Sequence, residues 1–297
     1  MEDGPLVEST LAAKGDVITF WMCTCCTLVF RMPRPSPTAL AHYYSSVLAK
    51  REPEILRKMG VSPETMNARN RVRYEEVYED VYRGVRKTRG HIIDLGGWDG
   101  ASLAPWRGAG WSTTLIDPSA PERALARSEM GIAATVNDAR ALGRPPADII
   151  TSYHCVEHID DLAKWADDVR CLCSNETLWV IEVPLELPHV RGLLGRKPLR
   201  SPQVHEEHLN FFTPQALRGL AGCMGLRALK VKMVVTLYYF GPTVSFRLYA
   251  RDGGSTAPAR SEKSPARLRA ELRVKLPVWR RVAGLKYRWY RARHPGA

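Results

Sequence analysis

Long apolar runs are absent from this sequence of 297 residues. No stretch of about 18 consecutive apolar residues occurs, which excludes a membrane-spanning helix from the expected elements. The opening segment, Met1 to Asp16, contains Glu2, Asp3 and Glu8 and has no apolar core, so it does not resemble a secretory signal. We therefore expect a cytoplasmic protein without a transmembrane helix.

Cysteine is also scarce, and its pattern argues against a disulfide framework. The seven residues are odd in number and mostly clustered: Cys23, Cys25, Cys26, Cys155, Cys171, Cys173 and Cys223. A reducing compartment fits such a chain better than an oxidising one. Cys23 and Cys26 have the spacing of half a zinc ribbon, but residues 1–22 hold no cysteine to complete four-coordinate zinc. We therefore expect a remnant packed on the body, and assign no metal ligands.

A net excess of positive charge is missing from most of the chain. The net charge is +12, but the residues from Ser255 to the end carry 12 Lys and Arg against 2 Asp and Glu. The body before this tail is therefore almost neutral, which argues against nucleic acid as a partner. If the protein has an anionic partner, the basic tail rather than the body is expected to contact it.

The basic tail has two apolar series at helical spacing. They are Leu268, Leu272, Leu276 and Trp279, then Val278, Val282, Leu285 and Trp289. Pro277 lies between them and predicts a kink or break in the helix. Such a basic amphipathic segment can contact an anionic membrane at its inner face, bind an acidic partner or polyanionic saccharide, or pack on the body with its charged face solvated. The sequence leaves these alternatives open.

The middle of the chain alternates short apolar runs with segments of helical pattern. This alternation predicts an α/β fold, a doubly wound domain with a mostly parallel sheet and an antiparallel edge hairpin. The expected strands lie at 91–97, 112–119, 147–153, 178–184, 226–235 and 243–252. An N-terminal helical cap is expected from the apolar positions Ile55, Met59, Val72, Val77 and Val81. We divide the chain into a cysteine-containing segment with the cap (1–88), the sheet domain (89–252), and a linker with a basic tail (253–297).

A glycine-rich turn follows the first of these strands. In "DLGGWDG", Asp94 to Gly100, the glycines let the backbone turn sharply and approach a ligand. Asp117 ends the next strand, where a carboxylate can accept hydrogen bonds from ribose hydroxyls. This much would also fit a nicotinamide enzyme.

Six landmarks in order, over roughly residues 20 to 250, resemble the class I methyltransferases. "DLGGWDG" resembles their glycine loop and "LIDPS" their second-strand acid, and "VNDAR" places Asp138 where the family holds the adenine amino group. "ADIITSYHCVEHIDD" resembles their fourth strand and following turn, "LWVIEVP" their fifth strand, and "EEHLNFFTPQALRGLAGCMGLRALKV" a later segment. The resemblance implies a Rossmann-like, seven-stranded, mostly parallel sheet and S-adenosylmethionine as cofactor. The residues it implies for cofactor binding are Asp94, Gly96, Gly97, Gly100, Asp117, Asp138 and Tyr153. Trp98 departs from the family, whose loop often has a central glycine there.

On the acceptor side, histidines and acids gather after the fourth strand and in "HEEHLNFF". In one interpretation His208 with Glu207 is the general base, as the resemblance to sugar C-methyltransferases implies, and His158 assists. In another, Glu157, His158 and a later histidine bind a divalent metal, although His154 stands where the resembling enzymes have an acid. In the third, these residues only cap and pack the loops. We favour His208, Glu207 and His158 as catalytic residues and assign no metal.

Together these features predict methyl transfer from S-adenosylmethionine to a small molecule or glycan. We favour a sugar acceptor, free as a nucleotide sugar or part of a polysaccharide or glycolipid, because of the resemblance to sugar methyltransferases. The alternatives are an O-methyltransferase of a phenolic or quinone-like natural product, and a non-catalytic module that keeps the fold.

Overall fold

The computed structural model describes residues 5–10, 17–23, 25–43, 57–58, 60–83, 85, 87–117, 133–134, 146–186, 208–238, 241–253 and 265–293. The main sheet has seven strands in the order β10-β11-β8-β7-β4-β5-β6. Their bounds are β4 His91–Leu95, β5 Ser112–Ile116, β6 Ala133–Ala134, β7 Ala147–Tyr153, β8 Cys173–Pro184, β10 Leu226–Tyr238 and β11 Gly241–Asp252. The five strands from β8 to β6 are parallel, whereas β11 is antiparallel to both β8 and β10. This is the mixed α/β, Rossmann-like arrangement that the alternating pattern predicts.

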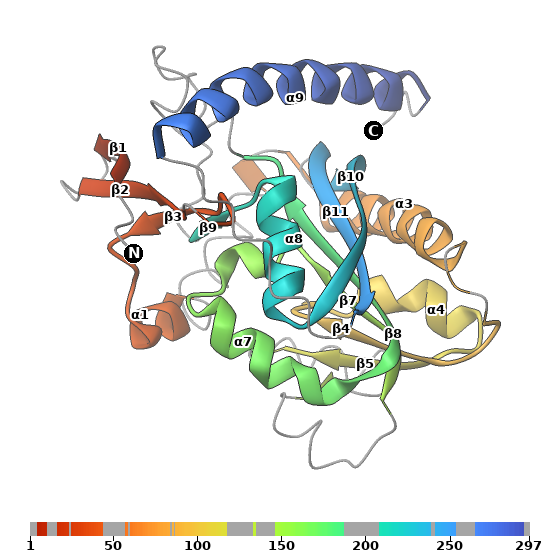
Figure 1. Cartoon of the computed structure of the whole chain (residues 1–297). Helices are drawn as coiled ribbons and strands as arrows, with labels where there is room; N and C mark the ends of the chain where they lie inside the picture. The colour runs from red at the N-terminus through yellow and green to blue at the C-terminus, as the bar shows by residue number, and fades with distance from the viewer. Residues whose placement is uncertain are drawn as a thin grey trace.

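Helices cover both faces of this sheet (Figure 1). On one face, α3 (Pro63–Tyr82) and α4 (Ala104–Gly108) pack against β4, β5, β7 and β8. On the other face lie α7 (Leu162–Val169) and α8 (Pro214–Cys223). Short 3-10 turns precede or follow them: η2 Ala101–Leu103, η3 Val156–His158 and η4 Arg170–Leu172.

The helix starts follow from the sequence. Ser62, Asp161 and Thr213 each accept a hydrogen bond from a backbone N–H of the first turn, and proline takes the first helical position in α3 and α8. A side-chain oxygen at this position satisfies a donor that the helix itself leaves unpaired, and proline lacks the N–H that would be unpaired there.

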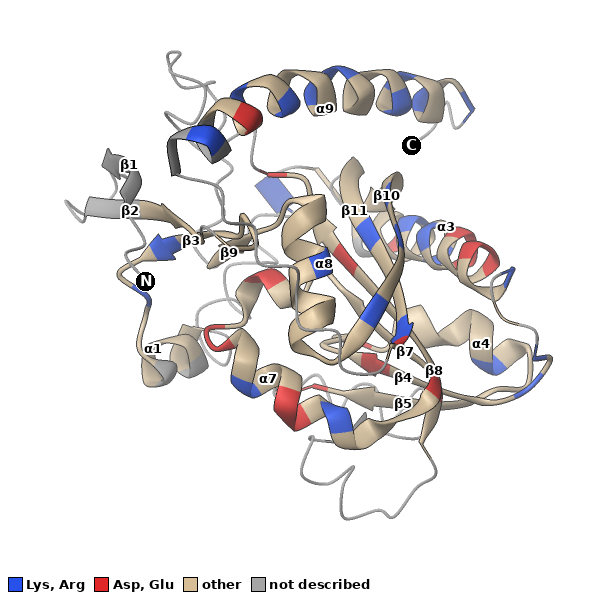
Figure 2. Cartoon of the chain, in the orientation of Figure 1, with Lys and Arg blue, Asp and Glu red and all other residues tan. Residues whose placement is uncertain are grey.

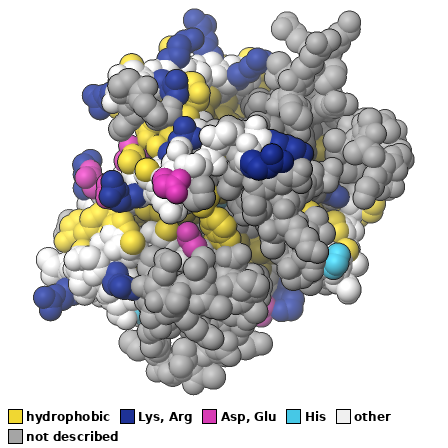
Figure 3. All heavy atoms as spheres, turned by 180° about the vertical axis from the view of Figure 1, so that it is seen from behind, with side chains coloured by type: hydrophobic (Ala, Val, Ile, Leu, Met, Phe, Trp, Pro, Cys, Tyr) yellow, Lys and Arg dark blue, Asp and Glu magenta, His cyan; other side chains and the backbone are white. Residues whose placement is uncertain are grey.

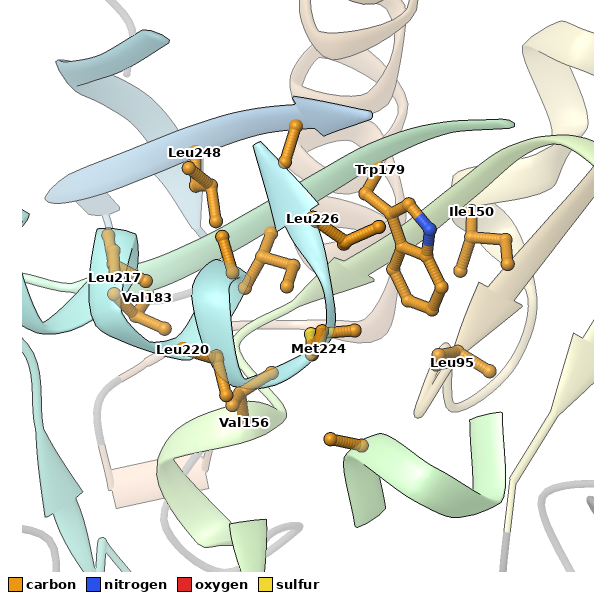
Figure 4. Close-up of a cluster of buried hydrophobic side chains, with 14 of the residues drawn as sticks. Leu95, Ile150, Val156, Trp179, Val183, Leu217, Leu220, Met224, Leu226 and Leu248 are labelled. Carbon is orange, nitrogen blue, oxygen red and sulfur yellow. The ribbon is translucent and has the colours of Figure 1, made fainter. Parts of the chain in front are cut away.

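The core between sheet and α8 explains why the strands are almost continuously apolar. Strands β7 and β8 are buried on both faces, and Figure 4 shows Trp179 beside Ile150, with Leu217 and Leu220 from α8 near Val183. Parallel strands covered on both sides bury successive residues rather than every second one.

The N-terminal segment forms a second, four-stranded sheet that the sequence reading did not foresee. Strands β1 (Pro5–Thr10), β2 (Val17–Met22), β3 (Val29–Met32) and β9 (Asn210–Phe211) pair in this order, each antiparallel to its neighbour. A short helix, α1 (Pro37–His42), follows β3. Of the expected helical cap, Val72, Val77 and Val81 lie on α3, while Ile55 and Met59 lie outside the described residues.

The tail forms one helix, α9 (Pro265–Arg293), and Pro277 lies inside it. The helix is therefore not broken at Pro277, while the kink that was the other predicted outcome stays a prediction. Packing explains the difference, because Leu276 before the proline and Ala283 after it are both buried against the body. Contacts on both sides of the proline hold the two halves in one helix at the cost of one backbone hydrogen bond. No helix among the described residues is both long enough and apolar enough to cross a membrane.

Candidate functional site

The loop after β4 turns back over the carboxyl ends of β4 and β5. Gly96 has a φ of 70° and donates its N–H to the Ile116 carbonyl over 2.8 Å. A Cβ on Gly96 would lie 2.3 Å from the Cys155 sulfur, so the sequence needs glycine here for space as well as conformation. Gly100, with a φ of 77°, ends the loop at the start of η2.

Two carboxylates flank this loop. The carboxylate of Asp94 is buried and accepts a hydrogen bond from the Thr151 hydroxyl at 2.7 Å and another from the Ser102 hydroxyl. Burial raises the pKa of Asp94 to about 6, although the two hydroxyls act in the opposite direction. Asp117 directly follows β5, and its carboxylate accepts a hydrogen bond of 3.3 Å from the Trp98 N–H. The backbone of Trp98 thereby ties the loop to the second acid.

The remaining predicted cofactor residues are placed differently. A Cβ on Gly97 would lie 2.3 Å from the Asp94 carboxylate, so the absence of a side chain lets that acid sit beneath the loop. Tyr153, at the end of β7, packs in the core cluster under α3 and α4. Burial raises the pKa of its hydroxyl. Asp138 lies outside the described residues.

His158, in the turn η3 after β7, and His208, just before β9, lie together. Their ring centroids are 4.5 Å apart and the rings are nearly perpendicular. The Nδ1 atom of His208 lies 2.6 Å from a carboxylate oxygen of Glu186, a residue two positions beyond the end of β8. Glu207, the predicted partner of His208, lies outside the described residues. Sequence reasoning missed Glu186, although its place just after a parallel strand was a usable signal.

The short strand β9 fixes this meeting of distant residues. The Leu209 N–H donates to the Glu157 carbonyl at 2.8 Å, and the Asn210 side chain donates to the Ile159 carbonyl at 2.6 Å. Arg34, from the segment after β3, donates to the Asn210 side-chain oxygen at 3.0 Å. These hydrogen bonds attach the segment "HLNFF" to the turn after β7, and they place His208 beside His158.

Glu157 is fully buried in this cluster. Neither oxygen of its carboxyl group has a hydrogen-bond partner in the part of the chain that the structure describes. Burial raises the pKa of Glu157 well above its ordinary value. Glu157, His158 and His208 each present one potential ligand atom, and these three atoms lie within 4.8 Å of one another. The set can hold a divalent cation, because carboxylate and imidazole are common ligands for such ions.

His154 adjoins the cluster but belongs to a second network. Its Nε2 atom lies 3.0 Å from the Ser245 hydroxyl and 3.3 Å from Glu182, while Nδ1 is 3.9 Å from Glu157. Burial lowers the pKa of His154, with the nearby Glu182 carboxylate opposing that shift. Arg247 pairs with Glu182 through two nitrogens, at 2.8 and 2.6 Å. His154 is thus committed to buried polar partners on β8 and β11.

The N-terminal thiols are not bonded to one another as disulfides. A hydrogen bond with Cys23, together with burial, raises the pKa of Cys26. Protonated thiols are poor metal ligands and poor nucleophiles, which agrees with a packed remnant. The zinc-ribbon interpretation stays a prediction.

A cavity of about 750 Å³ lies at the opposite end of the sheet. Its lining includes Lys87, Asp148 and Glu176, from the amino ends of β4, β7 and β8, and Lys232 and Arg251 from the edge hairpin. Ligands of doubly wound sheets bind at the carboxyl ends of the strands. This cavity is therefore separate from the glycine loop and the histidine cluster.

Comparisons with known proteins agree with this geometry. The family model described as "Methyltransferase domain" matches residues 67–231. A magnesium protoporphyrin IX methyltransferase from Synechocystis PCC 6803, solved with bound SAH, is 14% identical with a TM-score of 0.50, and the match covers 73% of this chain and 100% of that one. A SAM-dependent methyltransferase from Methanosarcina mazei is 13% identical with a TM-score of 0.46, covering 59% and 97%. At these identities the likeness concerns the fold alone. No curated protein matches the sequence significantly.

Proposed function

The chain belongs to the methyltransferase-domain family, and we propose that it transfers a methyl group from S-adenosylmethionine to a hydroxyl group of a sugar or glycan. S-adenosylmethionine is its cofactor, and the sulfonium of this cofactor supplies an electrophilic methyl group when bound. The preference for a sugar rests on the resemblance of "EEHLNFFTP" to sugar methyltransferases. A phenolic acceptor is the alternative that the acceptor screen below tests.

The loop between Asp94 and Gly100 and the carboxylate of Asp117 fit this cofactor. Two glycines with positive φ bring the backbone close to the carboxyl ends of β4 and β5, where a ligand can approach. Asp117 offers a carboxylate at the end of β5, which suits a pair of ribose hydroxyls. Asp138 is proposed to contact the adenine, and Tyr153 to support the pocket wall from the core.

The observation that carries the proposal is the pairing of His208 with Glu186 beside the turn that follows β7. With Nδ1 held at 2.6 Å from Glu186, a carboxylate orients the imidazole of His208, which is the arrangement in which an imidazole acts as a general base. In the proposed reaction the His208 imidazole would take the proton that the acceptor hydroxyl loses as its oxygen is methylated, and S-adenosylhomocysteine would be the leaving group. The Glu186 carboxylate stabilises the resulting imidazolium.

An acceptor screen tests the substrate class. The protein is incubated with S-adenosylmethionine and panels of nucleotide sugars, glycans and phenols, and the products are searched by mass spectrometry for one added methyl group. Methylation confined to sugars supports the proposal, whereas methylation confined to phenols overturns the sugar assignment. Turnover separates both from a non-catalytic module, and calorimetry with S-adenosylhomocysteine shows whether such a module still binds the cofactor.

Two variants test the site residues. His208→Ala is expected to reduce turnover by about 10²–10⁴-fold with nearly unchanged cofactor affinity, since a positioned base contributes about that much. His42→Ala, at an exposed histidine of α1, is the matched control. Asp117→Ala is expected to weaken S-adenosylhomocysteine binding by about 3 kcal/mol, because hydrogen bonds to a charged group are lost. Normal turnover by His208→Ala would move the base assignment to His158 or His154.

A second arrangement of the same site is favoured by the carboxyl group of Glu157, which has no hydrogen-bond partner in the described part of the chain. A divalent cation held by Glu157, His158 and His208 would lower the pKa of an acceptor hydroxyl, and the metal rather than the imidazole would then promote ionisation. Chelation distinguishes the two arrangements. Turnover that is lost on chelation and restored by Mg²⁺, Mn²⁺ or Zn²⁺ supports the metal, and turnover that is indifferent to chelators supports the imidazole base.

A further inference from the structure

Helix α9 lies along the top of the molecule in Figure 1 and is attached to the body by one face. Leu272, Leu276 and Tyr290 are buried, and the Trp279 ring packs edge-on against Phe246 of β11 with centroids 5.4 Å apart. The Tyr290 hydroxyl donates to the carboxylate of Glu76 on α3 at 3.3 Å. The helix is therefore a fixed part of the folded body, and its opposite side is available to a partner.

A second apolar row runs along α9 and faces solvent. Its members are Val274, Val278, Val282, Leu285 and Trp289, and their exposed fractions range from 37% to 69%. At about 100° per residue, this spacing confines the row to an arc of roughly 80° on the helix. The row is centred roughly 130° away from the buried face, so packing on the sheet does not cover it. We call this row the outer stripe.

Basic residues border the outer stripe on both sides. By helical position, Arg281 and Arg288 lie along one border and Lys275 and Lys286 along the other. All four side chains are exposed. Figure 2 shows Lys and Arg along the whole of α9, and Figure 3 shows such side chains beside hydrophobic atoms at the top of the molecule. An apolar row between two cationic borders is complementary to a partner with an apolar interior and anionic groups at its surface.

The acidic content of the helix argues against a second copy of this chain as the occupant. Within α9, Glu271 is the one acid against ten Lys and Arg residues. Glu271 lies 3.2 Å from Lys275 and 3.9 Å from Arg267 on the same helix. Two such helices brought face to face would place like charges opposite one another.

We propose that the outer stripe of α9 docks the protein on an anionic lipid surface. The apolar side chains enter the boundary between headgroups and acyl chains, and the bordering Lys and Arg side chains reach lipid phosphates. Trp289 suits this boundary because its ring is apolar with one polar N–H. The 29-residue helix is about 43 Å long and lies flat on such a surface. This docking is independent of the proposed methyl transfer.

Co-sedimentation of the full chain with vesicles tests the docking. We expect binding to phosphatidylcholine vesicles containing about 30% phosphatidylglycerol, little binding to phosphatidylcholine alone, and release as salt rises from 0.1 to 1 M. Leu285→Gln with Trp289→Gln should weaken binding at least tenfold, since both side chains lose apolar transfer. Leu229→Gln, at an exposed leucine of β10, is the matched control and should bind like the parent protein.

Charge removal tests the cationic borders. Arg281→Gln, Lys286→Gln and Arg288→Gln combined should weaken binding by about a hundredfold, since each cation near an anionic surface contributes about fivefold. Removing three cations elsewhere, Lys58→Gln, Arg71→Gln and Arg107→Gln, should have a much smaller effect. All of these positions are exposed, and thermal unfolding checks that each variant keeps the fold.

Several results would overturn the docking. These are absence of binding to anionic vesicles, equal binding to neutral ones, and affinity unchanged by the outer-stripe variants. A dimer in sedimentation velocity that disappears with Leu285→Gln and Trp289→Gln, without vesicle binding, would assign the stripe to a second copy. Binding to a soluble acidic polysaccharide that needs the arginines but not the stripe, again without vesicle binding, would also overturn it.

Discussion

Glu182 and Glu157 are equally buried, but they differ in the hydrogen-bonding and charged partners of their carboxyl groups. Glu182, on β8, lies against Arg247, His154 and the Thr236 hydroxyl. Glu157, in the turn after β7, has no hydrogen-bond partner among the described residues. Burial alone would raise the pKa of both, but the Arg247 guanidinium brings that of Glu182 below its usual range, whereas the pKa of Glu157 stays well above. Glu182 is therefore a carboxylate that stabilises the fold through its ion pair. Glu157 makes no such contribution among the described residues, and its carboxyl group can serve a bound ligand.

Asp94 is the intermediate case between these two glutamates. It is as deeply buried, but its partners are the neutral hydroxyls of Ser102 and Thr151 rather than a cation. Burial raises the pKa of Asp94 to about 6, whereas that of Glu182 is lowered. The charge of the partner, more than the depth of burial, orders the three acids.

The largest effect is expected from Glu182→Gln. The substitution removes the buried counter-charge of Arg247 and of the nearby Arg73, with Asp80 remaining as a partner of Arg247, and breaking such a buried pair typically costs about 3–5 kcal/mol of unfolding free energy. Chemical denaturation measures this loss. Glu176→Gln, at an exposed position of the same strand, is the control and should leave stability within about 0.5 kcal/mol. A loss of less than 1 kcal/mol would remove the distinction between Glu182 and Glu157.

Glu157→Gln should act in the opposite direction. In the folded state Glu157 keeps a proton that the unfolded chain releases above pH 4.5, so the folded state binds more protons and its stability falls as pH rises. Holding that proton at pH 7 costs up to about 3 kcal/mol. Glutamine avoids this cost, so the metal-free variant should be more stable than the parent by up to that amount at pH 7.

The gain from Glu157→Gln should shrink as pH falls toward 4.5, because the parent carboxyl is then protonated in both states. Denaturation at several pH values measures this dependence, with Glu75→Gln on the exposed side of α3 as control. A variant that is less stable than the parent at pH 7 would mean that Glu157 is ionised and paired. Chelation followed by the same measurement would then tell a bound cation from a protein partner.

Asp94→Asn should give a smaller gain. The folded pKa of about 6 against an ordinary 3.8 means that stability falls as pH rises between these values. Removing this titration is worth up to about 3 kcal/mol above pH 6, and weaker hydrogen bonds to Ser102 and Thr151 offset about 1 kcal/mol of it. We expect a net gain of about 2 kcal/mol at pH 7 that disappears near pH 4, with weaker cofactor binding. Asp167→Asn on α7 is the control, and an equal gain there would show a general charge effect.

Ser245→Ala should have the smallest effect. It removes one hydroxyl that lies 3.0 Å from the His154 ring nitrogen, while Glu182 remains as a partner of the same nitrogen. A single hydrogen bond contributes about 1 kcal/mol to stability. Thr243→Ala, two residues earlier on β11, is the comparison. A loss above 3 kcal/mol would show that the network around Glu182 depends on this hydroxyl rather than on Arg247.

The sequence by itself determined the α/β fold, the glycine loop and the acids at the ends of β4 and β5. These features depend on short-range patterns: apolar runs of strand length, helix caps, and glycines where the backbone turns. It also contained both apolar rows of the tail. For the same reason it gave Pro277 too much weight, since proline's local preference is visible in a sequence while the packing of Leu276 and Ala283 is not.

Only the tertiary structure decided which partners distant residues receive. It paired His208 with Glu186 across 22 positions of the chain and joined β9 to β3 across the whole domain. It paired Glu182 with Arg247 and left Glu157 without a hydrogen-bond partner among the described residues, although Glu182 lies on β8 and Glu157 follows the neighbouring strand β7. It also decided which row of α9 faces the body and which faces solvent. Contacts of this kind follow from how the layers pack, and a local pattern carries no information about the residue that packing will place opposite.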